Sequence, residues 1–191
     1  MRACLTTIVG LTFLAACARG ERDATSDTTR MDSAAAATTP DAGATAVMRD
    51  STGRDLGTLT LTESSSGVVI TGRLTGLTPG DHGIHLHTLG RCDAPTFESA
   101  GAHWNPTSRQ HGSQNPQGSH LGDLPNVTVG ADSSATVQLS MASGGSMRTG
   151  ANMLMDTDGA AVVIHAAPDD YRTDPSGASG ARIACGVVGA P

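Results

Sequence analysis

The sequence contains no lysine and only a few aromatic residues. All twelve basic residues are arginine, which excludes Schiff-base chemistry and Walker-type phosphate loops, because both need a lysine amine. One tryptophan, one tyrosine and two phenylalanines, set against 24 glycines, favour short strands and turns over a large helical core. The formal net charge is -6, so we expect no nucleic-acid partner, since phosphate binding needs a basic surface.

There are only four cysteines, and the first two lie in an N-terminal segment typical of an export leader. Arg2 precedes an apolar stretch, residues 5–16, that is too short to span a bilayer. We therefore expect residues 1–16 to be a signal peptide. The sequence Leu14-Ala15-Ala16-Cys17 resembles the lipobox of bacterial lipoproteins, in which the cysteine is acylated, and ordinary cleavage near these small residues is the alternative. The expected location is the cell envelope, with a lipid on Cys17 as the membrane anchor.

The other two cysteines, Cys92 and Cys185, remain in the exported part. An exported protein meets an oxidising compartment, so we expect these two to form a disulfide. In the loop-entropy model, closing a loop of this length is worth roughly 4 to 5 kcal/mol before strain is subtracted. Two metal-binding thiolates are the alternative, but the pair lacks the close C-x-x-C spacing of zinc sites.

Apolar periodicity divides the rest of the chain into a tether and a domain. Residues 17–43 are mostly Ala, Thr, Ser and Asp without periodicity, which predicts a flexible tether behind the acylated cysteine. Residues 44–191 show alternation typical of half-buried strands, for example Val68, Ile70 and Leu74. This predicts an all-β domain: an antiparallel, eight-stranded Greek-key sandwich or barrel of the immunoglobulin-like kind. Two long stretches, 90–126 and 166–181, lack the alternation and are expected to be functional loops.

All seven histidines lie in the predicted domain. His85 and His87 are two residues apart on an expected strand, so both face one side, where they can chelate one ion. His82 is expected on the other face of the same strand, as a hydrogen-bonded structural histidine. His165 ends a short apolar run of strand length.

One of the two predicted loops holds the remaining histidines. His103, His111, His120 and Asp123 supply three imidazoles and one carboxylate, a closed set suited to tetrahedral zinc. Any one of these residues taken alone could be a solvated loop histidine. Their joint clustering favours a metal centre.

Four motifs make the segment from about Ala44 to Gly189 resemble the copper-zinc superoxide dismutase family. They follow one another in the family order: Gly83-Ile84-His85-Leu86-His87, Gly101-Ala102-His103-Trp104-Asn105-Pro106, His120-Leu121-Gly122-Asp123-Leu124 and Gly180-Ala181-Arg182-Ile183-Ala184-Cys185-Gly186. The resemblance implies one copper and one zinc per subunit and superoxide as the substrate, converted to dioxygen and hydrogen peroxide.

The resemblance also implies roles for single residues. Copper would be held by His85, His87, His103 and His165, and zinc by His103, His111, His120 and Asp123. His103 would bridge the two metals as an imidazolate and take up a proton during the reaction. Arg182 would guide superoxide to the copper, and the disulfide would hold that arginine in place. Asp169 would bond to His111 and to either His85 or His87, which fixes the imidazole geometry.

The chain departs from the family pattern in two places. Ile84 and Trp104 replace aromatic residues that the family often has at these two positions, and we expect these changes to affect packing and not ligation. The loop 166–181 is short and carries only Arg172 where well-known members have lysines, so steering of the anion would rest on Arg172 and Arg182.

Two other functions compete with dismutation. The first is a domain that binds or buffers copper or zinc in the envelope without catalysis, and the second is a structural lipoprotein stabilised by its metal. The loss of a copper ligand or of Arg182 would mark the first, and neither is lost. The completeness of the ligand set disfavours both. The sequon Asn126-Val127-Thr128 is interpreted as the start of a strand, and the methionines at 141, 147, 153 and 155 as core residues. A homodimer is left open.

Overall fold

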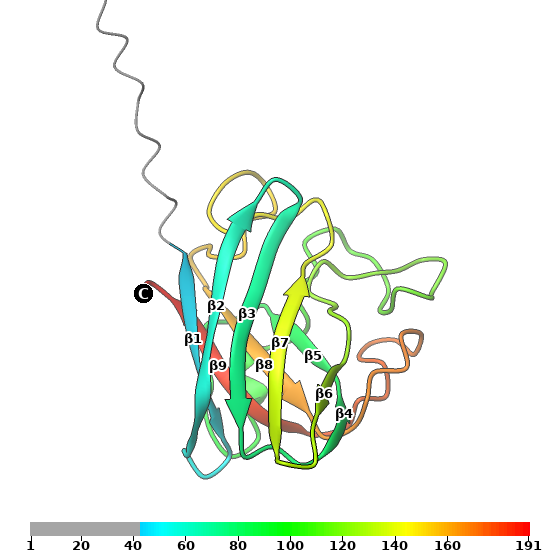
Figure 1. Cartoon of the computed structure of the whole chain (residues 1–191). Helices are drawn as coiled ribbons and strands as arrows, with labels where there is room; N and C mark the ends of the chain where they lie inside the picture. Colours follow the sequence, from blue (N-terminus) through cyan, green and yellow to red (C-terminus); the bar gives the residue numbers. More distant parts are fainter. Residues whose placement is uncertain (1–42) are drawn as a thin grey trace, which may run out of the picture. The chain divides into compact units, whose positions relative to one another are not determined.

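The computed structural model describes residues 43–191, which form a β domain with two long loops on one side (Figure 1). The predicted signal peptide, Cys17 and all of the tether except Gly43 lie outside the described residues. The described part has nine strands and one short 3-10 helix, η1 (Glu98–Ala100). Within residues 43–191, no helix is long and apolar enough to cross a membrane.

Seven antiparallel strands form one curled sheet in the order β5-β8-β9-β1-β2-β3-β7. Their bounds are β1 (Ala44–Asp50), β2 (Asp55–Ser64), β3 (Gly67–Thr75), β5 (Ile84–His87), β7 (Ser134–Ser140), β8 (Ala160–His165) and β9 (Arg182–Gly189). A second, two-stranded sheet pairs β4 (Gly80–His82) with β6 (Val127–Val129). The predicted all-β antiparallel class is confirmed.

Alternation of side chains along the strands builds the main core. Leu59 and Leu61 on β2 are fully buried, while the threonines between and beside them are exposed. Burying each such leucine contributes about 1.5 to 3 kcal/mol relative to leaving it in water. Trp104 and Leu121, from the loop between β5 and β6, join the same core. This loop is therefore anchored to the barrel by packing as well as by any metal.

The strand predicted across His82 to His87 is in fact two strands, which explains nine strands in place of eight. β4 ends at His82 and β5 begins at Ile84, and the two belong to different sheets. The Gly83 N–H donates to the Ala167 carbonyl (2.9 Å) and the Gly83 carbonyl accepts from the His165 N–H (2.8 Å). A Cβ at position 83 would lie 2.9 Å from the Ser179 Cβ, so this close crossing needs glycine.

Three long connections join the strands, two of which were expected. The loops 88–126 and 166–181 project from the same side of the sheet (Figure 1). The third, 141–159 between β7 and β8, was not predicted, and its residues Met147 and Leu154 are buried. Met141 and Met147 are buried in the main core and Met155 packs against it, but Met153 is 37% exposed, so the interpretation as a core residue was wrong for Met153.

Cys92 and Cys185 form the predicted disulfide, with their Cα atoms 5.7 Å apart. Both lie in a second, smaller hydrophobic cluster with Phe97, Ala161 and Val163, which covers the other face of β8 and β9. The disulfide and Phe97 together fix the start of the loop 88–126 against β9.

Candidate metal centre

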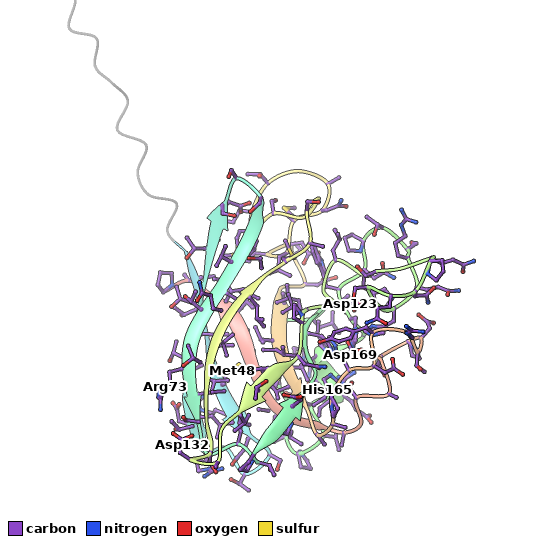
Figure 2. All side chains as sticks on the ribbon, turned by 45° about the vertical axis from the view of Figure 1, so that its right-hand side comes forward. Met48, Arg73, Asp123, Asp132, His165 and Asp169 are labelled. Carbon is purple, nitrogen blue, oxygen red and sulfur yellow. A yellow bond between two sulfur atoms is a disulfide. The ribbon has the colours of Figure 1, made fainter. Side chains whose placement is uncertain are left out.

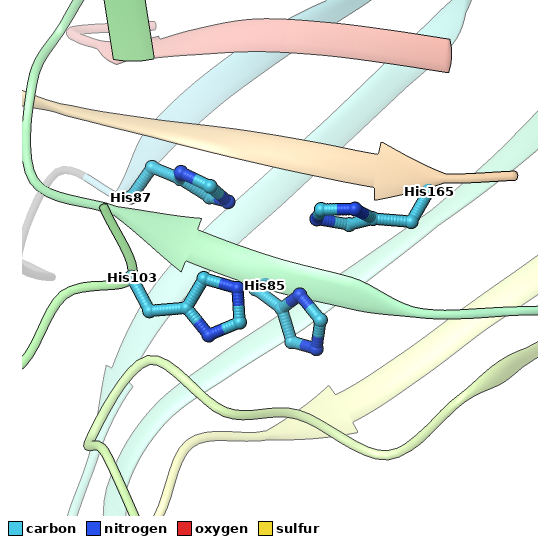
Figure 3. A group of neighbouring side chains, drawn as sticks. All are labelled: His85, His87, His103 and His165. Carbon is cyan, nitrogen blue, oxygen red and sulfur yellow. The ribbon is translucent and has the colours of Figure 1, made fainter. Parts of the chain in front are cut away.

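Four buried histidines meet where β5 and β8 lie side by side (Figure 3). His85 and His87 come from β5, and His165 ends β8. His103 arrives from the loop 88–126 and makes an isolated bridge with His87. We call these four residues the strand group. In five of their six pairs the ring centroids lie between 4.0 and 6.1 Å apart, and none of the four residues is more than 5% exposed.

One nitrogen of each strand-group ring has no hydrogen-bond partner among the described residues. These atoms are Nδ1 of His85 and Nε2 of His87, His103 and His165, all fully buried. Buried polar atoms are otherwise almost always paired, so four unpaired nitrogens in one place indicate a ligand that the nitrogens bind. One ligand atom from each residue lies within 4.8 Å of the others, which fits a single metal ion.

The opposite nitrogens of three of these rings are held by oxygen acceptors. The His87 Nδ1 faces the Gly101 carbonyl (2.9 Å), the His165 Nδ1 faces the Gly180 carbonyl (3.1 Å), and the His85 Nε2 faces the Asp169 carboxylate (2.8 Å). A carbonyl or carboxylate oxygen only accepts, so the proton sits on the held nitrogen and the free nitrogen keeps its lone pair. The rings are therefore oriented as ligands.

A second group of donors lies entirely in the loop 88–126. His103, His111, His120 and Asp123 offer ligand atoms within 4.8 Å of one another, and we call them the loop group. Asp123 Oδ1 lies 2.9, 3.0 and 3.1 Å from the Nδ1 atoms of the three histidines. Three N–H donors would exceed the two lone pairs of one oxygen, whereas four donors around a zinc ion would all be satisfied.

The two groups share one histidine and one carboxylate support. His103 turns Nδ1 to the loop group and Nε2 to the strand group. Asp169 accepts from His85 Nε2 through Oδ2 and faces His111 Nε2 through Oδ1, at 2.8 and 3.0 Å. Of the two partners left open by the sequence, His85 is the one that Asp169 contacts. Figure 2 shows Asp123, Asp169 and His165 together on the side of the two loops.

The surroundings shift the pKa values of these histidines in opposite directions. Burial lowers the pKa of His87 to about 2 and that of His165 to about 3. Burial also lowers the pKa of His103, to about 4, against the opposing hydrogen bond to Asp123. Burial acts in the same direction on His111, but its hydrogen bonds to Asp123 and Asp169 outweigh that effect and raise its pKa to about 9.

Arg182 lies beside the strand group, at a surface pocket. Its Nη1 and Nη2 donate to the carbonyls of Phe97 and Gly101, both at 2.7 Å. The Gly101 carbonyl is also the one that orients His87. The pocket is lined by Pro95, Thr96, Glu98, Gly101, Ala102, Gly180, Ala181 and Arg182. An anion in this pocket would lie beside the Arg182 guanidinium. It would also lie next to Gly101 and Gly180, whose carbonyls orient the rings of His87 and His165.

Several other predicted residues have clear places in the structure. His82 lies with Nδ1 at 2.7 Å from the His165 carbonyl and Nε2 at 2.8 Å from the Thr78 carbonyl, which leaves no ring nitrogen for a metal. Arg172 is exposed, and its guanidinium donates twice to Gln114 Oε1 of the other loop. The sequence did not reveal the roles of the Gly101 and Gly180 carbonyls, because backbone acceptors leave no side-chain signal.

The fold and the two linked groups define a class of protein: an antiparallel β domain with a histidine-bridged pair of metal-binding sites. Comparison with known families agrees, since the family described as copper/zinc superoxide dismutase (SODC) matches residues 56–188. The chain belongs to this family.

Individual relatives support the same assignment. The superoxide dismutase [Cu-Zn] of Caulobacter vibrioides is 44% identical over 151 residues, covering 76% of this chain and 84% of the relative. The crystal structure of a SOD-like protein from Bacillus subtilis is 40% identical with a TM-score of 0.72, covering 75% of this chain and 96% of that one. The Cu/Zn superoxide dismutase from Brucella abortus is 27% identical with a TM-score of 0.60, covering 76% and 98%.

Proposed function

We propose that the protein is a copper-zinc superoxide dismutase that converts superoxide to dioxygen and hydrogen peroxide. The observation that carries the proposal is the set of four unpaired, buried ring nitrogens beside the Arg182 pocket. Four imidazoles suit copper, and three imidazoles with a carboxylate suit zinc, so we assign one copper to the strand group and one zinc to the loop group. Relatives named superoxide dismutase [Cu-Zn], 41 to 44% identical, support this assignment.

The residues of the chain then have distinct tasks. When bound, copper supplies one-electron oxidation and reduction of superoxide, while zinc has no redox function. His103 takes up and returns one proton at Nε2, the ring nitrogen that faces the strand group, while its Nδ1 stays with the loop group. Arg182 binds the anion, and its position is fixed in advance by two carbonyl acceptors.

The closest competing function is metal binding without catalysis. A relative from Bacillus subtilis, 43% identical over 139 residues, is named a superoxide dismutase-like protein. The complete ligand set and the positioned Arg182 favour the enzyme. The deciding experiment combines the metal content of the purified domain with superoxide consumption, measured with and without cyanide. A copper-loaded domain that consumes no superoxide would establish the binding function instead.

We also propose that the enzyme acts in the cell envelope, anchored by an acylated Cys17. The support is the sequence alone: an apolar leader that ends at a lipobox-like motif, followed by a polar tether. Metabolic labelling with a radioactive fatty acid should mark the wild-type protein and not the Cys17→Ser variant. Labelling of neither protein, with both recovered in a soluble fraction, would indicate ordinary signal-peptide cleavage.

A further inference from the structure

The side chain of Asn126 makes a two-bond clamp on the backbone of Asp169. Its Nδ2 donates to the Asp169 carbonyl (2.9 Å), and its Oδ1 accepts from the Asp169 N–H (2.8 Å). Asn126 directly precedes β6, so the clamp joins the end of the loop 88–126 to the fourth residue of the loop 166–181. Both polar atoms of the amide are used, which leaves none free for glycosylation of the sequon in the folded chain.

Tyr171 completes this arrangement from the other side of Asp169. The Tyr171 phenol oxygen accepts from the backbone N–H of Asn126 (2.9 Å), and the Tyr171 N–H donates to Asp169 Oδ1 (2.6 Å). Asp169 is thus held at its N–H, its carbonyl and one carboxylate oxygen by only two residues. Neither of these residues contacts a ring of the strand group or the loop group through any recorded hydrogen bond.

Leaving aside contacts with the shared His103, Asp169 is the only described residue that hydrogen-bonds to one ring of the strand group and one ring of the loop group. It faces Nε2 of His85 and Nε2 of His111, and it is 3% exposed. A buried carboxylate that holds two imidazoles has to be placed accurately, since a small shift lengthens both bonds. Backbone placement of Asp169 is therefore a means of adjusting both ligand sets together.

We propose that Asn126 is a positioning residue that sets the affinity of both metal groups by fixing the backbone of Asp169. The proposal rests on the proposed copper and zinc sites, but it concerns metal binding and does not need turnover. A chain that binds zinc and copper without dismutation would refute the proposed activity and leave this inference standing.

The primary test is Asn126→Ala, with the zinc dissociation constant measured on the whole exported domain by chelator competition. We expect zinc binding to weaken about tenfold, the lower end of the range for groups that support ligands. Cobalt(II) in the loop group should show a changed visible spectrum, because the His111 ring loses its fixed orientation. A purely structural role would lower the thermal midpoint but leave the cobalt spectrum unchanged.

Asn105 offers a matched control. It is half-buried like Asn126, and it makes the same clamp on Arg109, with Nδ2 to the Arg109 carbonyl at 2.8 Å and Oδ1 from the Arg109 N–H at 3.0 Å. Arg109 contacts no ring of either group through a recorded hydrogen bond. Asn105→Ala should leave zinc affinity and the cobalt spectrum unchanged. Equal effects of Asn105→Ala and Asn126→Ala would overturn the proposal.

A double-mutant cycle with Asp169→Ala tests the route of the effect. If Asn126 acts through Asp169, adding Asn126→Ala to Asp169→Ala should weaken zinc binding no further. Additive losses would show that Asn126 acts elsewhere. Should Asn126→Ala fail to fold, Asn126→Asp keeps the size and the acceptor of the amide but loses the bond to the Asp169 carbonyl, and an intermediate loss is then expected. Wild-type zinc affinity in that variant would refute the clamp.

Discussion

The strand group and the loop group are built by different means, although they share His103. In the strand group, His85, His87 and His165 belong to paired strands, whose register is fixed by backbone hydrogen bonds. In the loop group, every ligand comes from the loop 88–126, and the common contact is one carboxylate oxygen of Asp123. Strand pairing in the sheet thus positions most of the strand group, whereas contacts with the Asp123 carboxylate hold the loop group together.

The difference extends to protonation. Burial lowers the pKa of His87 and His165 and keeps these two rings neutral, whereas hydrogen bonds to two carboxylates raise the pKa of His111 and favour its charged form. At neutral pH the strand group can therefore accept a metal ion without losing a proton from His87 or His165. The loop group must first release the proton of His111.

Replacing His103 should produce the largest effect, because His103 is the one residue that belongs to both groups. His103→Ala removes one ligand from each group, so we expect activity to fall at least about 100-fold, with weaker binding of both metals. Superoxide consumption and metal content of the same sample measure this. Full dismutation by the variant would show that His103 is not a bridge.

Arg182 belongs to neither group, so its removal should spare both. Arg182→Ala leaves the ligand rings in place but removes the guanidinium from the pocket, and we expect kcat/KM to fall about 10- to 100-fold. The dependence of the rate on ionic strength should weaken as well, since it reflects attraction of the anion to this charge. Copper and zinc contents should match those of the wild type, and a loss of either metal would assign Arg182 a structural role.

Local patterns in the sequence predicted the strands and grouped the histidines, but not their partners across the fold. Alternation at Val68, Ile70 and Leu74 predicted β3, because the buried face of a strand carries apolar side chains at every second position. The division of one predicted strand at Gly83 depends on contacts with Ala167 and Ser179, which lie more than eighty residues away. A periodicity of two cannot show such a change of sheet.

The same limit applies to the site. The family resemblance implied all seven ligand positions, five of them within the four motifs, but the choice between His85 and His87 as the partner of Asp169 depends on where the loop 166–181 crosses the barrel. The clamp of Asn126 was hidden for the same reason, since a sequon is read locally and its hydrogen bonds are made to a residue 43 positions away. Side-chain chemistry is readable from sequence, and long-range backbone contacts are not.

Proton release should separate the two groups at neutral pH. Metal-free His111 has a pKa of about 9 and carries a proton at neutral pH, so zinc must displace it, and zinc affinity should fall about tenfold per pH unit as the pH drops below about 9. Burial lowers the pKa values of His87, His165 and His103 to about 2, 3 and 4, so these three rings should add no pH dependence to metal binding by the strand group down to about pH 4.

Calorimetry in buffers of different ionisation enthalpy measures these protons directly. We expect about one proton released by zinc from His111, none by copper from His87, His165 or His103 in the metal-free domain, and about one by copper added to the zinc-loaded domain. The last proton comes from His103, because both of its ring nitrogens then serve as ligands. No release in the third titration would contradict the bridge while leaving the two separate sites intact.

The disulfide should have the smallest effect on either group, because it acts on the structure around them. The double variant Cys92→Ser/Cys185→Ser loses a cross-link over 93 residues, which should lower the free energy of unfolding by up to about 4 kcal/mol. Zinc affinity should change little, since the hydrophobic cluster around the disulfide contains no residue of the loop group. Activity should fall, because the Phe97 carbonyl that holds the Arg182 guanidinium becomes less fixed. The loss should be smaller than in Arg182→Ala, because the guanidinium itself remains. Denaturant unfolding and kcat/KM measured on one preparation test both parts, and a loss of zinc as large as that of His103→Ala would show that the disulfide also orders the loop group.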